Sequence, residues 1–419
     1  MKDLNANLAL FSTEDDDVTS SDATHNGLPQ TITTAEGEGE AVATLGKVDD
    51  EEIQLSPAEL LRQKRKQELL SILGSGKAAK FDAVLACPTD KAALSIRAVS
   101  PILGTSTGKR GIKVLLETSD GSQSYRGRTD TFYDLLNAVE DGIGTDDDDS
   151  SADGAEASFN SEKVLSSILD AARVFVPPPL RSLLPNDKYI PMRDLFTSPA
   201  VSFAYERGWR QGFAAAGFPG VDSEYQLVKE YFDSATRTTS SSMSSVVVDM
   251  SCATGLMTRR LAQSGDYDRV IGCDYSESML YEARNRINQA GLTTKAKLGR
   301  TQLDLVRLDV AQIPMQDDSV SALHAGAAMH CWPDVQTGLN EIYRVLKPGG
   351  RYFASTFLSE YFQGLQAVER EEITAQMQAF QYFESTDKLK EMLLNAGFEE
   401  DKITIDVLGS ACAIMKCEK

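Results

Sequence analysis

From about residue 245 onward, the spacing of hydrophobic and polar positions is typical of alternating strands and helices. Short aliphatic runs predict buried strands at 245–249, 268–273, 303–308, 319–325 and 351–357. Between them, apolar residues three and four positions apart predict helices that start near Gly255, Ser276 and Asp334. This alternation favours an open, doubly wound and mostly parallel sheet with helices on both faces.

The end of the chain breaks this alternation. A helix is predicted at 386–395, and the strands "ITIDVLG" and "ACAIMKCE" follow with only a short connection between them. Two strands joined so tightly must pair antiparallel. The pattern therefore predicts an α/β fold with a Rossmann-like, seven-stranded sheet whose last strand is antiparallel.

The N-terminal half follows a different pattern. Ser56-Pro57-Ala58-Glu59 is a capping box that opens a helix, and short β-like runs between 80 and 138 predict a small β-rich module. "SPAVSFAYERGWRQGFAAAGF" predicts a helix whose Tyr205, Trp209 and Phe213 share one face and suit core packing. The expected domains are an acidic tail (1–54), a helix with the β-rich module (55–139), an acidic linker (140–160), a helical lead-in or lid (161–242), and the sheet domain (243–419).

Charge is concentrated in two segments of the 419-residue chain. The net charge is −20, of which residues 1–52 carry −11 and residues 140–156 carry −8. Apart from Phe11, both segments lack aromatic residues, and they are expected to be disordered, solvating tails. The remainder is nearly neutral, which disfavours nucleic acid as a partner because such binding requires a basic face. No apolar run approaches the roughly 20 residues of a membrane span, so a soluble protein is expected.

Cysteines and the N-terminus bear on the compartment. The six cysteines form no C-x-x-C pair, which fits free, buried thiols in a reducing compartment. The first seventeen residues lack arginine and turn acidic, so they do not resemble a secretory signal or an organelle transit peptide. This N-terminus is therefore not expected to be the native one if the protein is imported into an organelle, and the cytoplasm is the alternative location.

The candidate chemistry lies where the predicted strands end, because doubly wound sheets bind ligands beyond the carboxyl ends of their strands. The first strand delivers Asp249 and a loop containing Ser251, Ala253 and Gly255. The next three deliver Asp274, Asp309 with Val310, and Ala325. Three acids would repel a phosphate but suit a cationic molecule that carries a ribose and an adenine. S-adenosyl-L-methionine meets that description, whereas "MSCATG" cannot supply the G-x-G-x-x-G of a nicotinamide dinucleotide loop.

The segments "VVVDMSCATG", "VIGCDYSESML", "VRLDVAQIP", "ALHAGAAMHCWPD" and "NEIYRVLKPGGRY" resemble class I SAM-dependent methyltransferases of the methyltransferase type 11 group. With "RDLFTSPAVSFAYERGWRQGFAAAGFPGVDSEY", the similarity extends to the plastid-associated, uncharacterised methyltransferases of plants and algae, over about residues 185–419. The resemblance implies a plastid location and a cofactor site. In that site Asp249, Ser251, Ala253 and Gly255 surround the methionine part, Asp274 holds the ribose, Tyr275, Met279, Asp309 and Val310 surround the adenine, and Ala325 lies near the sulfonium.

The family's N-terminal module is normally a zinc ribbon with two cysteine pairs. Here "ACPTDK" keeps only Cys87, Asp90 stands at the second cysteine position, and Thr118 to Gly121 contain no cysteine. A structural zinc site needs four Cys or His ligands. A degenerate, metal-free ribbon is therefore expected.

Methyl transfer from a sulfonium requires chiefly that the acceptor and the methyl group be held in line. If the acceptor needs a base, His330 is the candidate because it follows the fourth strand of the sheet domain; the alternative is a structural histidine packed near Trp332. The expected acceptor is a small, quinone- or lipid-like molecule. Two alternatives stay open: an RNA methyltransferase, which the near-neutral charge disfavours, and a non-catalytic SAM-binding protein. The identity of the acceptor, the atom that is methylated and the oligomeric state are not predicted.

Overall fold

The computed structural model describes residues 80–102, 111–139, 213–214, 217–238, 244–293, 298–299, 301–358, 383–409 and 411–419. Contacts divide the chain into Met1–Leu55 and Ser56–Lys419, and every described residue belongs to the second unit. The acidic tail, the helix opened by Ser56, the acidic linker and the lead-in helix with Tyr205 and Trp209 lie outside the described residues. No helix among the described residues is long and apolar enough to cross a membrane.

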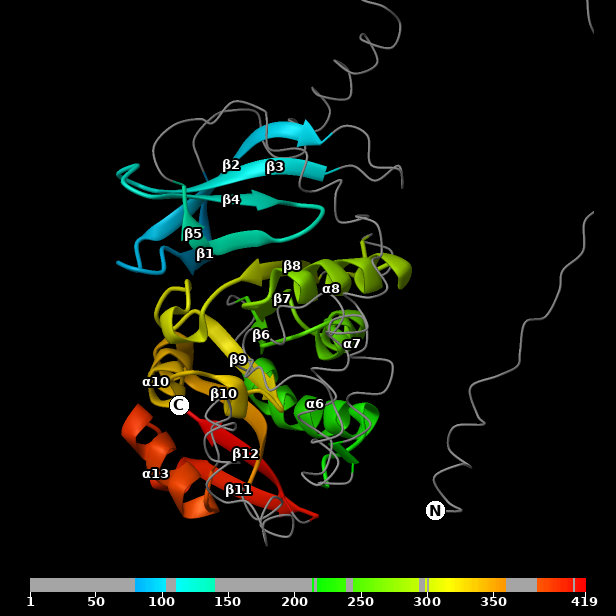
Figure 1. Cartoon of the computed structure of the whole chain (residues 1–419), viewed down its shortest axis with the longest axis vertical. Helices are drawn as coiled ribbons and strands as arrows, with labels where there is room; N and C mark the ends of the chain where they lie inside the picture. The colour runs from blue at the N-terminus through cyan, green and yellow to red at the C-terminus, as the bar shows by residue number, and fades with distance from the viewer. Residues whose placement is uncertain are drawn as a thin grey trace, which may run out of the picture. The chain divides into compact units, whose positions relative to one another are not determined.

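Within the described residues, seven strands of the C-terminal part form the order β8-β7-β6-β9-β10-β12-β11 (Figure 1). Their bounds are Gln302–Arg307, Arg269–Asp274, Val246–Met250, Val320–Gly326, Leu346–Phe357, Cys412–Glu418 and Ile403–Leu408. The first five pair parallel to one another, and β12 pairs antiparallel with both β10 and β11. The predicted doubly wound sheet with an antiparallel last strand is confirmed.

Helices cover both faces of this sheet because its strands are apolar on both sides. Val246 and Val248 of β6 belong to the core under α10 (Val335–Val345) and α13 (Thr386–Ala396), whereas Val247 belongs to the core under α6 (Val221–Thr238) and α7 (Leu256–Ser264). The helix α8 (Glu277–Gln289) packs through a third cluster. Side-chain caps start these helices where the sequence predicts them: the hydroxyl of Ser276 accepts from the amide of Met279, and Asp334 accepts from Thr337.

The strand β10 differs from its prediction at its start. It begins at Leu346, five residues before the expected start, and includes Gly349 and Gly350. Leu346 pairs with Val320, and the register shifts before Arg351. Gly349 has a φ of 75°, a conformation that glycine adopts without strain, so the glycine pair forms a bulge inside the strand instead of only ending the helix before it.

The predicted β-rich module consists of five neighbouring antiparallel strands. They are β1, β2, β3, β4 and β5, with bounds Lys80–Ala86, Ala93–Ile102, Gly111–Thr118, Ser124–Arg128 and Tyr133–Ala138. The strand β5 then pairs parallel with β8 through Tyr133 and Val306, so the sheet of the module continues the larger sheet. Leu85 and Tyr125 also share one core with Val306.

A buried ion cluster joins the module to the larger sheet. Arg269 of β7 donates from Nε to Asp304 Oδ2 of β8 at 2.7 Å and from Nη1 to Asp82 Oδ1 of β1 at 2.8 Å. All three side chains are about nine-tenths buried. Because removing one partner of a buried ion pair leaves an uncompensated charge, loss of Asp82 or Asp304 should destabilise the chain strongly.

Candidate functional site

One cavity lies at the carboxyl ends of β6, β7, β8 and β9. Its wall consists of Met250, Ser251 and Ala253 after β6, Asp274 to Ser276 with Met279 after β7, Leu308 to Val310 after β8, and Gly326 to Ala328 with Cys331 to Pro333 after β9. The structure thus brings together seven of the predicted site residues: Ser251, Ala253, Asp274, Tyr275, Met279, Asp309 and Val310.

The loop after β6 has an unusual backbone. Ser251, Ala253 and Gly255 all have positive φ, at 55°, 49° and 73°. For a residue with a side chain this conformation costs about 1–2 kcal/mol relative to the right-handed region. The glycine-like turn geometry therefore persists although two of its three positions carry a Cβ atom. At Gly255 a Cβ would also approach Ala283 to 3.1 Å, which favours glycine there.

Neighbouring strand ends hold this loop in place. The amide of Cys252 donates to the carbonyl of Cys273 at 2.8 Å, and the amide of Ala253 donates to Asp274 Oδ2 at 2.8 Å. From the opposite wall, Trp332 Nε1–H donates to the hydroxyl of Ser251 at 3.0 Å. The loop after β6 is thus tied to the ends of both β7 and β9.

Asp274 occupies the end of β7 and combines burial with backbone hydrogen bonds. Its second oxygen accepts from the amide of Ser276 at 2.8 Å. Burial raises the pKa of the Asp274 carboxyl to about 6, although the hydrogen bonds from Ser276 and Ala253 lower it in part. The group is therefore ionised at pH 7.5 and close to its titration range, in a position to accept hydrogen bonds from a ligand.

Asp309 and Val310 form the wall after β8. Asp309 caps the short 3-10 helix η6 (Val310–Gln312), with Oδ1 accepting from the amide of Ala311 at 2.9 Å. Val310 packs towards Gly338 of α10, where an added Cβ would lie 3.4 Å from a Val310 methyl. A carboxylate beside an aliphatic side chain suits a flat ring with an exocyclic amine.

Asp249 lies beneath the cavity, and its side chain does not line it. One oxygen is 2.7 Å from His324 Nδ1 of β9, and the other accepts from the hydroxyl of Thr258. On the far side of the imidazole, His324 Nε2 is 3.7 Å from Glu224 Oε1 of α6. Both carboxylates are nearly fully buried, so the imidazole lies between two buried acids.

This arrangement charges His324. Burial lowers the pKa of the imidazole, but the hydrogen bonds and charges of Asp249 and Glu224 outweigh burial and raise that pKa to about 9. A Cβ on Gly326 would lie 2.8 Å from both His324 and Glu224, so only glycine fits between this group and the cavity. His324 and Glu224 were not predicted from the sequence; a histidine inside the apolar strand "VSALHAG" was the available signal for His324.

Besides Asp249, three further predicted site residues are not part of the cavity wall. Ala325 is buried within β9, and Gly255 lies behind the loop at the start of α7. His330 is buried with its ring centroid 4.8 Å from that of Phe357, and burial lowers the pKa of its imidazole to about 3. His330 belongs to an aromatic cluster in which Phe357 also contacts Phe213 and Phe218.

The thiols near the cavity are poor nucleophiles. Burial, with the nearby carboxylates Asp274 and Asp249, raises the pKa of Cys252 and Cys273, and burial also raises the pKa of Cys331. Among the described residues, no group of three or more His, Cys, Asp or Glu side chains could hold a metal ion. In the module, Cys87 Sγ instead contacts the hydroxyls of Thr89 and Tyr125 at 3.2 and 3.5 Å.

A family profile described as a methyltransferase domain matches residues 248–354. The chain is 39% identical over 207 residues to an uncharacterised chloroplastic methyltransferase of Arabidopsis thaliana, covering 49% of this chain and 55% of that protein. It is 30% identical over 172 residues to the demethylmenaquinone methyltransferase of Oceanobacillus iheyensis, covering 36% and 69%. The chain spans about half the length of the Arabidopsis relatives that it matches, 55% and 43%.

Solved structures also resemble the chain. One is a SAM-dependent methyltransferase from Aquifex aeolicus, with 15% identity and a TM-score of 0.33, covering 48% of this chain and 99% of that one. Another is phosphoethanolamine N-methyltransferase 2 of Haemonchus contortus in complex with S-adenosyl-L-methionine, with 21% identity and a TM-score of 0.37, covering 52% and 46%.

Proposed function

Because the chain belongs to the class I methyltransferases of the methyltransferase type 11 group, whose cofactor is S-adenosylmethionine, we propose that it methylates a small, quinone- or lipid-like acceptor. One observation carries the part of this proposal that concerns the cofactor. Two carboxylates, from Asp274 and Asp309, and a left-handed loop around Ser251 line one cavity at adjacent strand ends. That combination suits a cationic ligand with a ribose and an adenine.

We assign each part of the ligand to its nearest matching group. The carboxylate of Asp274 accepts hydrogen bonds from the two ribose hydroxyls. Asp309 accepts from the exocyclic amine of the adenine, while Val310 and Met279 cover the ring and Tyr275 lies beside it. The methionine part follows the backbone of the loop after β6, and its carboxylate lies towards the N-terminus of α7.

Asp249 has an indirect role in this proposal. Its oxygens are engaged by Thr258 and by the charged imidazole of His324, so it fixes the loop from below instead of binding the ammonium directly. The sulfonium supplies a methyl group bound to a good leaving group. The chain then has to hold the acceptor in line with that methyl group and to exclude water, and such positioning supplies several kcal/mol.

Support for an apolar acceptor comes from the wall after β9, where Ala327, Ala328, Trp332 and Pro333 face the cavity. The relative from Oceanobacillus iheyensis is named for a quinone substrate, demethylmenaquinone. We assign His330 to packing beneath this wall rather than to proton transfer, because its imidazole is buried and stays neutral. If the acceptor has to lose a proton, the base must be a group other than His330, either on the acceptor itself or elsewhere in the chain.

We also propose a plastid location, since both Arabidopsis relatives carry the word chloroplastic in their names. Import of tagged protein into isolated chloroplasts tests this location directly. If tagged protein made with the N-terminus that its own transcript encodes is not imported into the chloroplasts, the cytoplasm is the favoured location.

The decisive experiment for the function has two stages. A thermal melt with S-adenosylmethionine should raise the melting temperature of the wild-type chain and leave that of Asp274→Ala nearly unchanged. A panel of demethylated quinones, phenols and lipids is then incubated with methyl-labelled cofactor. A folded protein with no shift at millimolar cofactor would exclude the enzyme. Binding without transfer to any panel member would favour a non-catalytic protein, and retention of RNA at low salt would favour an RNA substrate.

A further inference from the structure

The segment 313–316 connects the cavity wall to the N-terminal module. It begins three residues after Val310, which lines the cavity. The strand β1 of the module pairs with it: the amide of Ala86 donates to the carbonyl of Pro314 at 2.9 Å, and that of Gln316 donates to the carbonyl of Val84 at 2.8 Å. Leu85 and Met315 form the antiparallel bridge between them.

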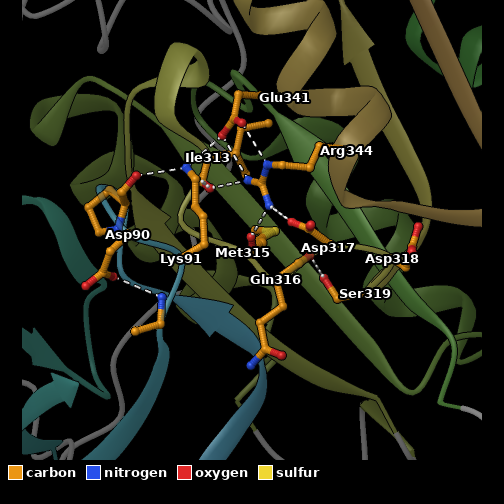
Figure 2. Close-up of polar contacts among 12 residues, drawn as sticks. Asp90, Lys91, Ile313, Met315, Gln316, Asp317, Asp318, Ser319, Glu341 and Arg344 are labelled. Atoms are coloured by element: carbon orange, nitrogen blue, oxygen red, sulfur yellow. Dashed lines mark hydrogen bonds and ion pairs between the residues drawn. The ribbon is translucent and has the colours of Figure 1, made fainter. Parts of the chain in front are cut away.

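Lys91 extends this contact with its side chain. Figure 2 shows Lys91 and Arg344 reaching the same stretch of backbone from the module and from α10. The ammonium of Lys91 donates to the carbonyl of Ile313 at 3.2 Å and to Glu341 Oε2 at 2.9 Å. Arg344 donates to the same Ile313 carbonyl at 2.9 Å and to that of Met315 at 2.8 Å.

Glu341 joins the two cations into one group. It contacts Lys91 through Oε2 and Arg344 through both oxygens. The side chains of Lys91, Glu341 and Arg344 are 26%, 15% and 20% exposed, so this group is sheltered from solvent more than an ordinary surface pair. One carbonyl thus receives donors from two parts of the chain that lie about 250 residues apart.

The backbone of Lys91 indicates that its side chain is needed there. Its φ is 60°, which residues with a Cβ rarely adopt, and its amide closes a tight turn on the carbonyl of Cys87 at 3.0 Å. Glycine would relieve the strain at this position. A lysine in this conformation points its ammonium at Ile313 and at the carbonyl of Pro88, 2.8 Å away.

The turn between Ile313 and the cavity is short and stiff. The helix η6 spans only three residues, and Asp309 closes it at its start by accepting from the amides of Ala311 and Gln312. Val310 is held from the side of α10 at Gly338. We therefore expect a displacement of Ile313 to displace Asp309 and Val310 by a similar amount.

We propose that Lys91 is a positioning residue of the cofactor site: by binding the carbonyl of Ile313 it makes the N-terminal module hold Asp309 and Val310 against the adenine. This inference rests on the proposed function, because it takes the adenine to lie at Asp309. It gives the module, whose ribbon-like turn holds Cys87 and Lys91, a task in cofactor binding that requires no metal.

The test compares Lys91→Met with Arg97→Met in the full chain. Arg97 forms an exposed ion pair with Glu117 inside the module, so its loss removes a charge without touching the segment 313–316. The ligands are S-adenosylhomocysteine and its inosine analogue, which lacks the exocyclic amine, measured by titration calorimetry. Hydrogen exchange of residues 309–316 is recorded for each variant.

For Lys91→Met we expect the dissociation constant for S-adenosylhomocysteine to rise about threefold to tenfold. Discrimination against the inosine analogue should shrink, and exchange at 309–316 should speed up. Lys91→Arg should restore part of each effect, and Arg97→Met should behave as wild type. A role confined to stability would lower the melting temperature and leave the discrimination unchanged.

Failure of the inference is separable from failure of the proposed function. Folded wild-type protein that does not bind S-adenosylhomocysteine would refute the proposed function itself. Wild-type protein that discriminates the two ligands, with Lys91→Met discriminating equally and exchanging equally slowly, would overturn the inference. If Lys91→Met does not fold, Lys91→Gly carries the same test, because it removes the ammonium and relieves the backbone strain at a φ of 60°.

Discussion

The indole of Trp332, in the cavity wall after β9, donates a hydrogen bond of 3.0 Å to the hydroxyl of Ser251, in the loop after β6. Ser251 has a φ of 55°, where glycine would be less strained. The serine is therefore strained in its backbone, but its hydroxyl fixes the position of an aromatic side chain in the cavity wall. The two effects have opposite signs on stability, which makes them separable by substitution.

Substituting Ser251 should separate them. Ser251→Ala keeps the Cβ strain and loses the hydrogen bond, so cofactor affinity should fall about twofold to tenfold, corresponding to about 0.5–1.5 kcal/mol. Ser251→Gly loses the same bond but relieves the strain, so it should melt at a higher temperature than Ser251→Ala. In a Trp209→Phe background the remaining tryptophan reports on the wall through its emission. Equal melting temperatures for the two variants would show that the strain is absent.

Ala253 provides a simpler case. Its φ is 49° and its amide donates to Asp274, whose position does not depend on the methyl group of Ala253. Ala253→Gly should raise the free energy of unfolding by about 1 kcal/mol and leave cofactor affinity equal or tighter. Calorimetric titration with denaturant melts checks both quantities. A large loss of affinity would mean that the cofactor does not follow this loop.

Cofactor affinity should depend on pH through Asp274. Its pKa of about 6 lies above the ordinary value of 3.8, so protonation below pH 6 removes the acceptor that the ribose hydroxyls require. Because ligand binding favours the ionised form, the dissociation constant should rise about tenfold between pH 7.5 and pH 5. Asp274→Asn should bind weakly at both values, without this slope. A wild-type affinity that is flat between these pH values would refute the assignment of Asp274.

Stability should depend on pH through His324. Its folded pKa of about 9 exceeds the ordinary 6.5, so its contribution is fully present below pH 6.5 and is lost as the pH rises through 9. The contribution is on the order of 3 kcal/mol for this pKa difference. Urea unfolding between pH 6 and pH 10 measures it. His324→Gln should be less stable at pH 7, since Asp249 and Glu224 lose the charge between them, and its profile should be flatter over this range.

The strands and their ends were predictable because they depend on local patterns. The aliphatic runs place β6 to β9 within a residue or two of their observed bounds, and the acids Asp274 and Asp309 follow directly from where those runs stop. The backbone of the loop was predictable in part, because small residues after a buried strand indicate a tight turn.

What could not be predicted depends on the order of the strands. Asp249 meets His324 only because β6 pairs with β9 in the register that places these residues side by side, 75 positions apart in sequence. The site of Lys91 likewise requires the module to pair with the segment 313–316. For His330, its position just after the fourth strand suggested a place in the cavity, but the short helix η7 (Met329–Cys331) turns its side chain towards Phe357.

The order β10-β12-β11 also constrains how the protein is made. In the described sheet β11 pairs with β12, the strand that follows it in the chain, and β12 is inserted between β10 and β11. On the ribosome, β11 therefore emerges before it has a partner, and β10 presents an open edge until β12 leaves the exit tunnel. A nascent chain stalled before Cys412 would therefore expose an edge that chaperones or neighbouring chains can bind.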